Sequence, residues 1–219
     1  MVLISYKYKF IYIKNEKVAG TSVESFFGQF CIDPDKKYEF KHRTDEVESN
    51  FGIIGSRFGK FKRWINHISA EKIKKYKKKE FKKYLKFCVV RNPYDVAVSK
   101  YVWKLYRKKI EHKSFKEYVK KNFICEKSQF RRYSIKGKSV CDYHIRYEHL
   151  HEDIVELCKI LNITNYDIKD LPNFKSEVRD KSKHYSQFYD DETKKLVYEK
   201  CKEEFELFGY KFEKQEENK

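Results

Sequence analysis

A strand, a short loop and a helix follow one another between residues 9 and 30, and this unit constrains the fold more than any other stretch. Residues 10–13 read Phe-Ile-Tyr-Ile, a β-branched and aromatic run typical of a buried strand. The loop ends at Gly20. Glycine can adopt backbone angles that other residues avoid, so we expect Gly20 to supply such an angle at the end of the loop. Thr21 or Ser22 is then expected to cap a helix with a regularly spaced apolar face.

The first turn of such a helix is suited to anions. Its first N–H groups lack partners within the helix, and the helix dipole favours negative charge there. Lys17 adds a positive charge, and Thr21 and Ser22 add hydroxyl donors, so we expect a phosphate or sulfate group to bind. A nucleoside-triphosphatase P-loop does not fit, because position 15 is Asn instead of Gly and no Lys follows Gly20.

A second helix start follows a second buried strand. Residues 87–90, Phe-Cys-Val-Val, predict the strand, and Asn92, Pro93 and Asp95 are typical of a helix N-terminus. Arg91 stands between the strand and the helix, where a guanidinium can hold a phosphate through two parallel hydrogen bonds. Taken alone, the pattern favours a simpler interpretation, a capped helix with an Arg–Asp ion pair at its start.

Strands that alternate with helices predict a single α/β domain with a P-loop-like parallel sheet flanked by helices. We expect this domain to span residues 1–212, with a polar tail at 213–219. Residues 31–64 are interpreted as a long irregular excursion. The two strand-to-helix loops should open at the same edge of the sheet, where ligands bind. Two anion sites at one edge indicate a ligand with two separated anionic groups.

The charge of the chain limits the class of partner. The sequence has 219 residues and a net charge of +17, which attracts anions. Twelve basic and two acidic residues lie between Lys60 and Lys86, so this segment contributes +10 (12 − 2). The segment is either a solvated helix surface or a face that binds an acidic acceptor. A nucleic-acid-binding protein is an alternative, although the sequence has no helix-turn-helix, zinc-finger or RNP signature.

Six cysteines are scattered along the chain without a CxxC pair. We therefore expect a reducing compartment, cysteines that fill the core, and no metal site. Charged residues interrupt any apolar run near residue 7, and no stretch is long enough to span a membrane. These features predict a cytoplasmic chain without a signal peptide or membrane anchor, and a trimmed catalytic domain is the alternative.

Taken together, the two helix starts show that the chain resembles the PAPS-dependent sulfotransferases, in particular the carbohydrate and heparan-sulfate-type branch. The first loop of that family has the pattern PKxxGTS, and residues 16–22 match it except for Glu16, where proline is usual. The second has the pattern RxPxxxxxSxY, which this chain matches at Arg91, Pro93, Ser99 and Tyr101. The resemblance covers nearly the whole chain, but only the two loops are specific.

The resemblance implies transfer of a sulfuryl group from PAPS to a hydroxyl of an acceptor, with PAP as the product and without a metal. The acceptor is expected to be a glycan, and an acidic one if the basic segment binds it. In that family, a lysine equivalent to Lys17 stabilises charge on the leaving oxygen, and Arg91 and Ser99 would bind the 3′-phosphate. The loop expected to hold the 5′-phosphosulfate comprises Lys17, Val18, Ala19, Gly20, Thr21 and Ser22.

The resemblance also points to His67 as the general base, because members of this branch often have a histidine there. An unperturbed imidazole pKa suits this role near neutrality. Glu24, one turn past the loop, is the alternative base. Arg131, Arg132 and residues 181–185 are candidates for contact with the nucleotide or an anionic acceptor. A P-loop kinase with a degenerate motif is the last alternative, and it predicts Mg²⁺-dependent ATP binding.

Overall fold

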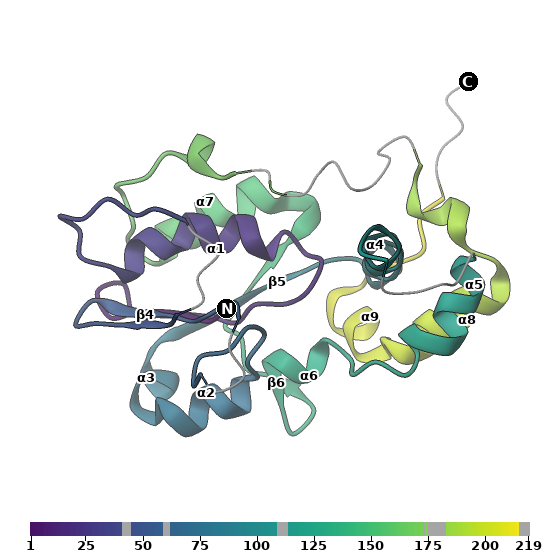
Figure 1. The fold of residues 1–219 in the computed structure, drawn as a ribbon, viewed down its shortest axis with the longest axis horizontal. Helices are drawn as coiled ribbons and strands as arrows, with labels where there is room; N and C mark the ends of the chain where they lie inside the picture. The colour runs from purple at the N-terminus through teal and green to yellow at the C-terminus, as the bar shows by residue number, and fades with distance from the viewer. Residues whose placement is uncertain (41–44, 59–61, 109–113, 173, 175–182, 215–219) are drawn as a thin grey trace. The chain divides into compact units, whose positions relative to one another are not determined.

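The central sheet has the strand order β3-β4-β1-β2-β5-β8 in the computed structural model (Figure 1). The structure describes residues 1–40, 45–58, 62–108, 114–172, 174 and 183–214, and all statements below concern these residues. The strands are β1 Leu3–Ser5, β2 Phe10–Tyr12, β3 Val47–Glu48, β4 Gly52–Ile54, β5 Leu85–Val90 and β8 Tyr143–Arg146.

The sheet is mixed, which corrects the expectation of a parallel sheet. Strands β2, β5 and β8 pair in parallel, whereas the β1–β2, β1–β4 and β3–β4 pairs are antiparallel. Residues 31–64, expected to be irregular, contribute β3 and β4. These strands have two and three residues, too few to produce a recognisable alternation in the sequence. The α/β class itself is confirmed.

The chain divides into two compact units, which are described separately. The first comprises residues 1–90 and 131–174 and contains the sheet. Helices α1 (Gly20–Gly28) and α7 (Leu150–Ile160) cover one face of the sheet, and α2 (Ala70–Tyr76) and α3 (Lys78–Lys83) lie on the other (Figure 1). Shorter elements in or at the edge of this unit are η1 Gln29–Cys31, α6 Phe130–Tyr133, β6 Ser134–Ile135, β7 Lys138–Ser139, η3 Tyr147–His149 and η4 Ile168–Asp170.

Aromatic side chains fill the space between the parallel strands and α1. The Phe87 ring of β5 lies 5.1 Å from Tyr12 and 5.5 Å from Phe10 of β2, measured between ring centroids. Phe27 of α1 lies 4.9 Å from Phe87. All four side chains are fully buried. This packing fixes the start of α1 beside the end of β2, and so positions the loop that joins them.

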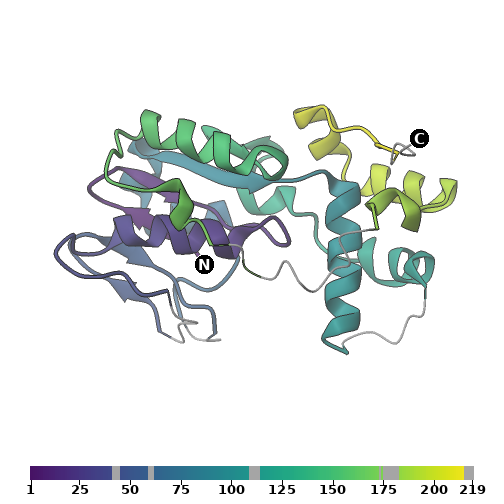
Figure 2. The ribbon, with the colours of Figure 1, turned by 90° about the horizontal axis from the view of Figure 1, so that it is seen from above.

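The second unit comprises residues 91–130 and 175–219 and is helical among its described residues. In Figure 2 the long helix α4 stands beside α5 and the α8–α9 segment. Its buried core includes Tyr94, Tyr101, Tyr118 and Phe205. The elements are α4 Pro93–Tyr106, α5 Phe115–Tyr118, the π-helical turn η2 Val119–Phe123, η5 Tyr185–Phe188, α8 Asp191–Lys200 and α9 Lys202–Phe208.

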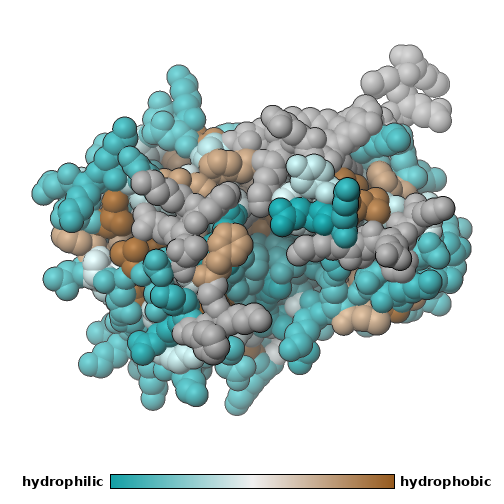
Figure 3. Space-filling model, in the orientation of Figure 1, coloured by the Kyte–Doolittle hydropathy of each residue, from teal (hydrophilic) through white to brown (hydrophobic). Residues whose placement is uncertain are grey.

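Hydrophilic side chains predominate on the face shown in Figure 3, in keeping with the high content of charged residues. Within the described part of the chain, no helix combines the length and apolar character needed to cross a bilayer. Lys60, at the start of the basic segment, and residues 215–219 of the expected tail lie outside the described residues.

Candidate functional site

The loop between β2 and α1 contains two residues whose backbone has the left-handed helical conformation. Lys17 has a φ of 60° and Ala19 a φ of 55°, angles unusual for residues with a side chain. Backbone that alternates right- and left-handed conformations can turn successive N–H groups toward one concavity, a common way to bind an anion. The expectation that Gly20 supplies the unusual angle is wrong, because its φ is not in this region.

Gly20 is required for space instead. A Cβ atom there would lie 3.1 Å from the carbonyl oxygen of Asn15 and 3.2 Å from side-chain carbons of Lys14. The loop therefore folds back on itself so closely that a larger residue at position 20 would push its backbone apart. Tyr12 strengthens this arrangement, because its hydroxyl donates to the Gly20 carbonyl at 3.3 Å.

Helix α1 begins at Gly20, and its N-cap is Ala19, two residues before Thr21 and three before Ser22. No side chain caps this helix among the described residues, so the expectation that Thr21 or Ser22 does so is wrong. Both hydroxyls lie in the first turn. Thr21 Oγ1 accepts from Arg57 at 3.0 Å, and Ser22 Oγ accepts from the Phe174 N–H at 3.4 Å. A helix start without a side-chain cap keeps the N-terminal attraction for an anion.

Arg57 is a cation at this site that sequence reasoning missed. It follows β4, and β4 was not recognisable because of its shortness. Its guanidinium donates to Thr21 in the first turn of α1, and Lys17 lies in the loop that leads into this helix. A basic residue shortly after the Gly-Ile-Ile strand was the available signal. The helix dipole and these two side chains together give the loop a positive character.

Glu16, which stands where the resembling family has proline, forms an ion pair with Arg132. The carboxylate and guanidinium are 2.6 Å apart, and their side chains are 32% and 23% exposed. Arg132 lies on α6, so the structure brings one of the two candidate arginines to the loop. The pair compensates the negative charge that Glu16 adds beside an anion site.

A buried ion pair lies under the loop. The Lys14 ammonium contacts the Glu24 carboxylate, and both side chains are almost fully buried. Burial lowers the pKa of Lys14, and the Glu24 charge opposes this shift. Asn15 Nδ2 donates to the Val89 carbonyl at 2.9 Å and so ties the loop to β5. Glu24 therefore serves the scaffold of the loop in this structure.

His67 lies against the same loop. Its Nδ1 is 3.1 Å from the Lys14 carbonyl, an acceptor only, so Nδ1 carries the proton and Nε2 the lone pair. Burial lowers the pKa of His67 to about 3, and the Arg132 charge contributes to this shift. The imidazole is therefore neutral at physiological pH. The backbone of His67 is also left-handed, with a φ of 56°.

The second motif belongs to the second unit, where the expected helix start is confirmed. Asn92 Oδ1 accepts from the Tyr94 N–H at 3.1 Å, and Arg91 Nε donates to Asp95 at 2.8 Å. Arg91 also lines a cleft together with Lys100 and other residues of this unit. Ser99 is half-buried on α4 and is not among the residues that line this cleft.

Two tyrosines among the residues singled out in the sequence are buried in the second unit. Tyr101, the last residue of the second motif, is buried in its aromatic core. Tyr185 is also buried, and its hydroxyl accepts from the Glu213 N–H at 2.7 Å. In the 181–185 segment, residues 181 and 182 lie outside the described residues. His184 Nδ1 accepts from the Ser186 N–H at 3.3 Å and so caps η5.

Comparison with known proteins gives one family. Residues 1–211 match the sulfotransferase family, so the match spans both units. An uncharacterized protein of Archaeoglobus fulgidus is 36% identical over 89 residues, which cover 39% of this chain and 74% of that protein. No solved structure matches.

Proposed function

Because the chain belongs to the sulfotransferase family, we propose that it transfers a sulfuryl group from PAPS to a hydroxyl of a carbohydrate acceptor. The observation that carries this proposal is the start of α1. The loop has two residues with left-handed backbone, α1 has no side-chain cap, and Arg57 reaches Thr21; together with the Lys17 side chain, these features would form one anion site. Such a site suits the phosphosulfate end of the donor.

The resemblance to the family assigns a set of residues to each end of this donor. Lys17, the N–H groups of residues 18–20 and the hydroxyls of Thr21 and Ser22 would hold the 5′-phosphosulfate. Arg91 and Ser99 would hold the 3′-phosphate, which distinguishes PAPS from donors that lack it. The Arg91–Asp95 pair orients the guanidinium in advance. The donor supplies the activated sulfuryl group, and the chain supplies positioning and charge.

Charge stabilisation during transfer is the proposed role of Lys17. As the new bond between the acceptor oxygen and sulfur forms, the bond between sulfur and the 5′-phosphate oxygen breaks. The electron pair of that bond remains on the phosphate, where negative charge grows. An ammonium group and the helix N-terminus beside this oxygen stabilise the charge more in the transition state than in the ground state. We propose that this in-line displacement requires no metal.

His67 is the proposed general base, and Nε2 is its basic atom. Nδ1 is already committed to the Lys14 carbonyl, which fixes the tautomer and the ring orientation. Nε2 would take the proton of the acceptor hydroxyl. Burial and Arg132 hold the His67 pKa low in this structure, and an anionic donor beside the ring would raise it toward the useful range. Glu24 suits the role less because it is buried and paired with Lys14.

Calorimetric titration with PAP in a chelator-containing buffer tests donor binding. We expect binding to the unaltered protein and a loss of roughly tenfold or more in Arg91→Ala, because a charge-assisted phosphate contact contributes about 1.5–3 kcal/mol. Lys79→Ala is the matched control, since this lysine is exposed on α3. Binding of ATP with Mg²⁺, but not of PAP, would contradict the proposal and support a kinase.

Incubation with ³⁵S-labelled PAPS and a panel of glycans, phenols and steroids tests the acceptor. The proposal expects label on at least one carbohydrate, and at least about a hundredfold slower labelling by the Lys17→Ala variant. Label confined to phenolic or steroid hydroxyls would retain sulfuryl transfer but contradict the carbohydrate acceptor.

A further inference from the structure

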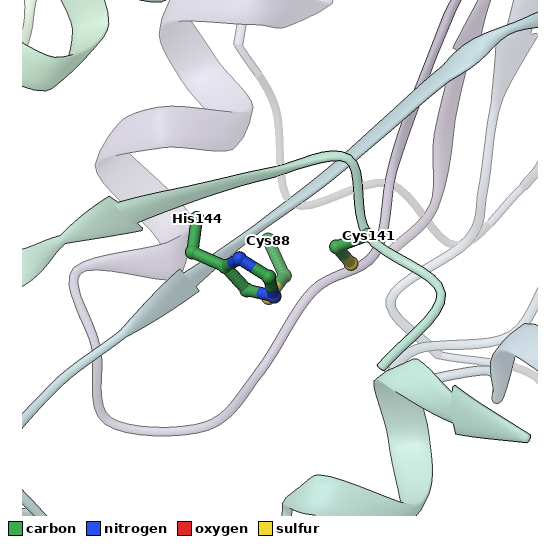
Figure 4. Close-up of side chains that lie close together, drawn as sticks. All are labelled: Cys88, Cys141 and His144. Atoms are coloured by element: carbon green, nitrogen blue, oxygen red, sulfur yellow. The ribbon is translucent and has the colours of Figure 1, made fainter. Parts of the chain in front are cut away.

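Three side chains with metal-binding atoms converge in the first unit, apart from the residues assigned above. Figure 4 shows Cys88 on β5, His144 on β8, and Cys141 in the turn that precedes β8. The two sulfur atoms and a ring nitrogen of His144 all lie within 4.8 Å of one another. Cys88 is buried, whereas Cys141 and His144 are half-buried.

The backbone of the sheet places these residues together. Cys88 and His144 are direct partners in the parallel β5–β8 pairing, so their side chains project from the same face. Asp142 fixes the position of its neighbour Cys141, because its N–H donates to the Lys86 carbonyl and its carboxylate accepts from the Lys86 N–H, both at 2.7 Å. The convergence therefore follows from the strand register.

Ser139 orients two members of the cluster. Its hydroxyl lies 2.9 Å from Nε2 of His144 and accepts from the Cys141 N–H at 3.2 Å. The contact with Ser139 fixes the orientation of the His144 ring, and a metal bound at Nε2 would take the place of the serine hydroxyl there.

The donor set selects a class of metal. Two thiolates and an imidazole suit zinc and other thiophilic ions, and disfavour magnesium and calcium, which prefer oxygen ligands. Zinc–sulfur bonds of about 2.3 Å place two sulfurs of a tetrahedral site about 3.8 Å apart. The 4.8 Å limit on the separations in the cluster is about 1 Å longer, which small side-chain rotations can close.

We propose that Cys88, Cys141 and His144 bind one zinc ion through two thiolates and one imidazole. The two thiols lose their protons on binding, and a fourth position remains for water. The ion would join β5 to β8 across the sheet edge. This differs from the expectation that the cysteines only fill the core. The Cys141-x-x-His144 spacing is a signal that a search for CxxC pairs misses, and Cys88 is distant from both in the sequence.

The position of the cluster suggests what the ion stabilises. The ring of Tyr133 lies 6.1 Å from the ring of His144, measured between centroids. The backbone carbonyl of Tyr133 accepts from the Val140 N–H at 2.9 Å. Arg132, the residue before Tyr133, holds Glu16 of the anion-binding loop. A metal at the base of this segment would hold α6 in place and so support the Glu16–Arg132 pair.

Metal binding can be measured without donor or acceptor, so its failure is distinct from failure of the proposed function. The reduced full-length chain is stripped with a chelator and titrated with Co²⁺ as a spectroscopic probe, then with Zn²⁺. We expect thiolate-to-cobalt charge-transfer absorption that saturates at one equivalent and disappears on addition of zinc. At a hundredfold excess of zinc over its dissociation constant, the melting temperature should rise by about 5 °C or more.

Variants then assign the site. Cys141→Ser and His144→Gln should each weaken zinc binding by roughly 10- to 100-fold or more, since even outer-shell changes have effects of this size. Cys158→Ser, a buried cysteine elsewhere, and Cys125→Ser, an exposed one, should leave it unchanged. Absence of the charge-transfer band in the unaltered protein would overturn the proposal whether or not the variants fold. Stoichiometric binding that survives both Cys141→Ser and His144→Gln would also overturn it.

Discussion

Single residues of the loop after β2 carry most of the chemistry we propose. Lys17 and Ala19 adopt left-handed conformations, and Arg57 reaches the first turn of α1. The small size of Gly20, and not an unusual backbone angle, lets the loop fold closely on itself. The result is a loop whose backbone shape depends on packing and whose positive charge comes from two side chains and a helix end.

Replacement of Lys17 by Ala should lower kcat by about 10²- to 10³-fold, because one preformed donor to a developing charge has an effect of this size. The dissociation constant for PAP should change by less than about tenfold, since the loop N–H groups remain. Steady-state kinetics and calorimetry give the two values. Lys17→Arg, which keeps the charge, should recover part of the rate. A kcat within threefold of the unaltered enzyme in Lys17→Ala would assign the charge stabilisation elsewhere.

Stability should depend on pH through His67. Its pKa is about 3 in the folded chain and about 6.5 when unfolded, so the unfolded state binds more protons below pH 6.5. Stability is therefore lost as the pH falls from 6.5 toward 3. Asn tolerates the left-handed backbone of this position and does not titrate.

Between pH 7 and pH 5, His67→Asn should lose about 2 kcal/mol less unfolding free energy than the unaltered chain. Urea unfolding at both pH values measures this difference. The other histidines are common to both proteins and cancel in the comparison. Equal losses in the two proteins would mean that the folded-state pKa of His67 is close to its ordinary value.

At the level of secondary-structure elements, the Glu16–Arg132 pair links the anion-binding loop to α6. Arg132→Ala leaves the Glu16 carboxylate without this partner beside the proposed phosphosulfate site. The repulsion should weaken PAP binding by roughly 5- to 10-fold, about 1 kcal/mol.

Addition of Glu16→Gln to Arg132→Ala should restore most of the affinity, because it removes the uncompensated charge. Calorimetry on the two single variants and the double variant completes the cycle. Equal weakening in Arg132→Ala and the double variant would show that Arg132 contacts the ligand directly instead of neutralising Glu16.

Asn92 at the start of α4 makes a second hydrogen bond in addition to that of an ordinary N-cap. Its Oδ1 accepts from the Tyr94 N–H, and its Nδ2 donates to the Lys211 carbonyl at 2.9 Å, so it joins the helix to the end of the chain. Asn92→Ala should reduce the unfolding free energy by about 2–3 kcal/mol, the sum of a cap and a buried hydrogen bond.

Ser114→Ala provides the comparison, because Ser114 caps α5 at an exposed position and should lose only about 1 kcal/mol. Denaturant unfolding measures both changes. A loss in Asn92→Ala no larger than in Ser114→Ala would show that the contact with Lys211 adds no stability.

For the whole molecule, the surplus of positive charge is the dominant property. In the basic segment, Lys77 and Lys86 have acidic partners, Glu48 and Asp142. Lysines 74, 75, 78 and 79 on α2 and α3 are exposed. They are therefore among the residues of the segment that are available to an acidic glycan, and they stabilise the fold little.

Substitution of these four lysines by Gln should lower the salt concentration at which the protein elutes from a sulfated-polysaccharide column. Each surface change should alter stability by no more than about 0.5 kcal/mol. The matched control removes four exposed lysines elsewhere: Lys136, Lys138, Lys159 and Lys169. Equal shifts in both variants would mean that net charge alone governs retention, and that α2 and α3 form no acceptor site.

The sequence by itself determined the local features of this protein. The β2 and β5 strands and the helix start at Asn92 depend on neighbours within a few residues, so their signals can be recognised in the sequence. The two helix starts also pointed to the sulfotransferase family, which the match over residues 1–211 confirms. The specific roles of Lys17, His67, Arg91 and Ser99 stay predictions.

Only the tertiary structure decided which distant residues meet. Arg57 reaches Thr21, Arg132 reaches Glu16, and Cys88 joins Cys141 and His144, each across a long stretch of chain. The short strands β3 and β4 and the true N-cap of α1 were equally inaccessible, because two or three residues carry no periodicity and Ala19 has no capping side chain. These features depend on strand register and on the packing of the loop against the sheet, which no local pattern encodes.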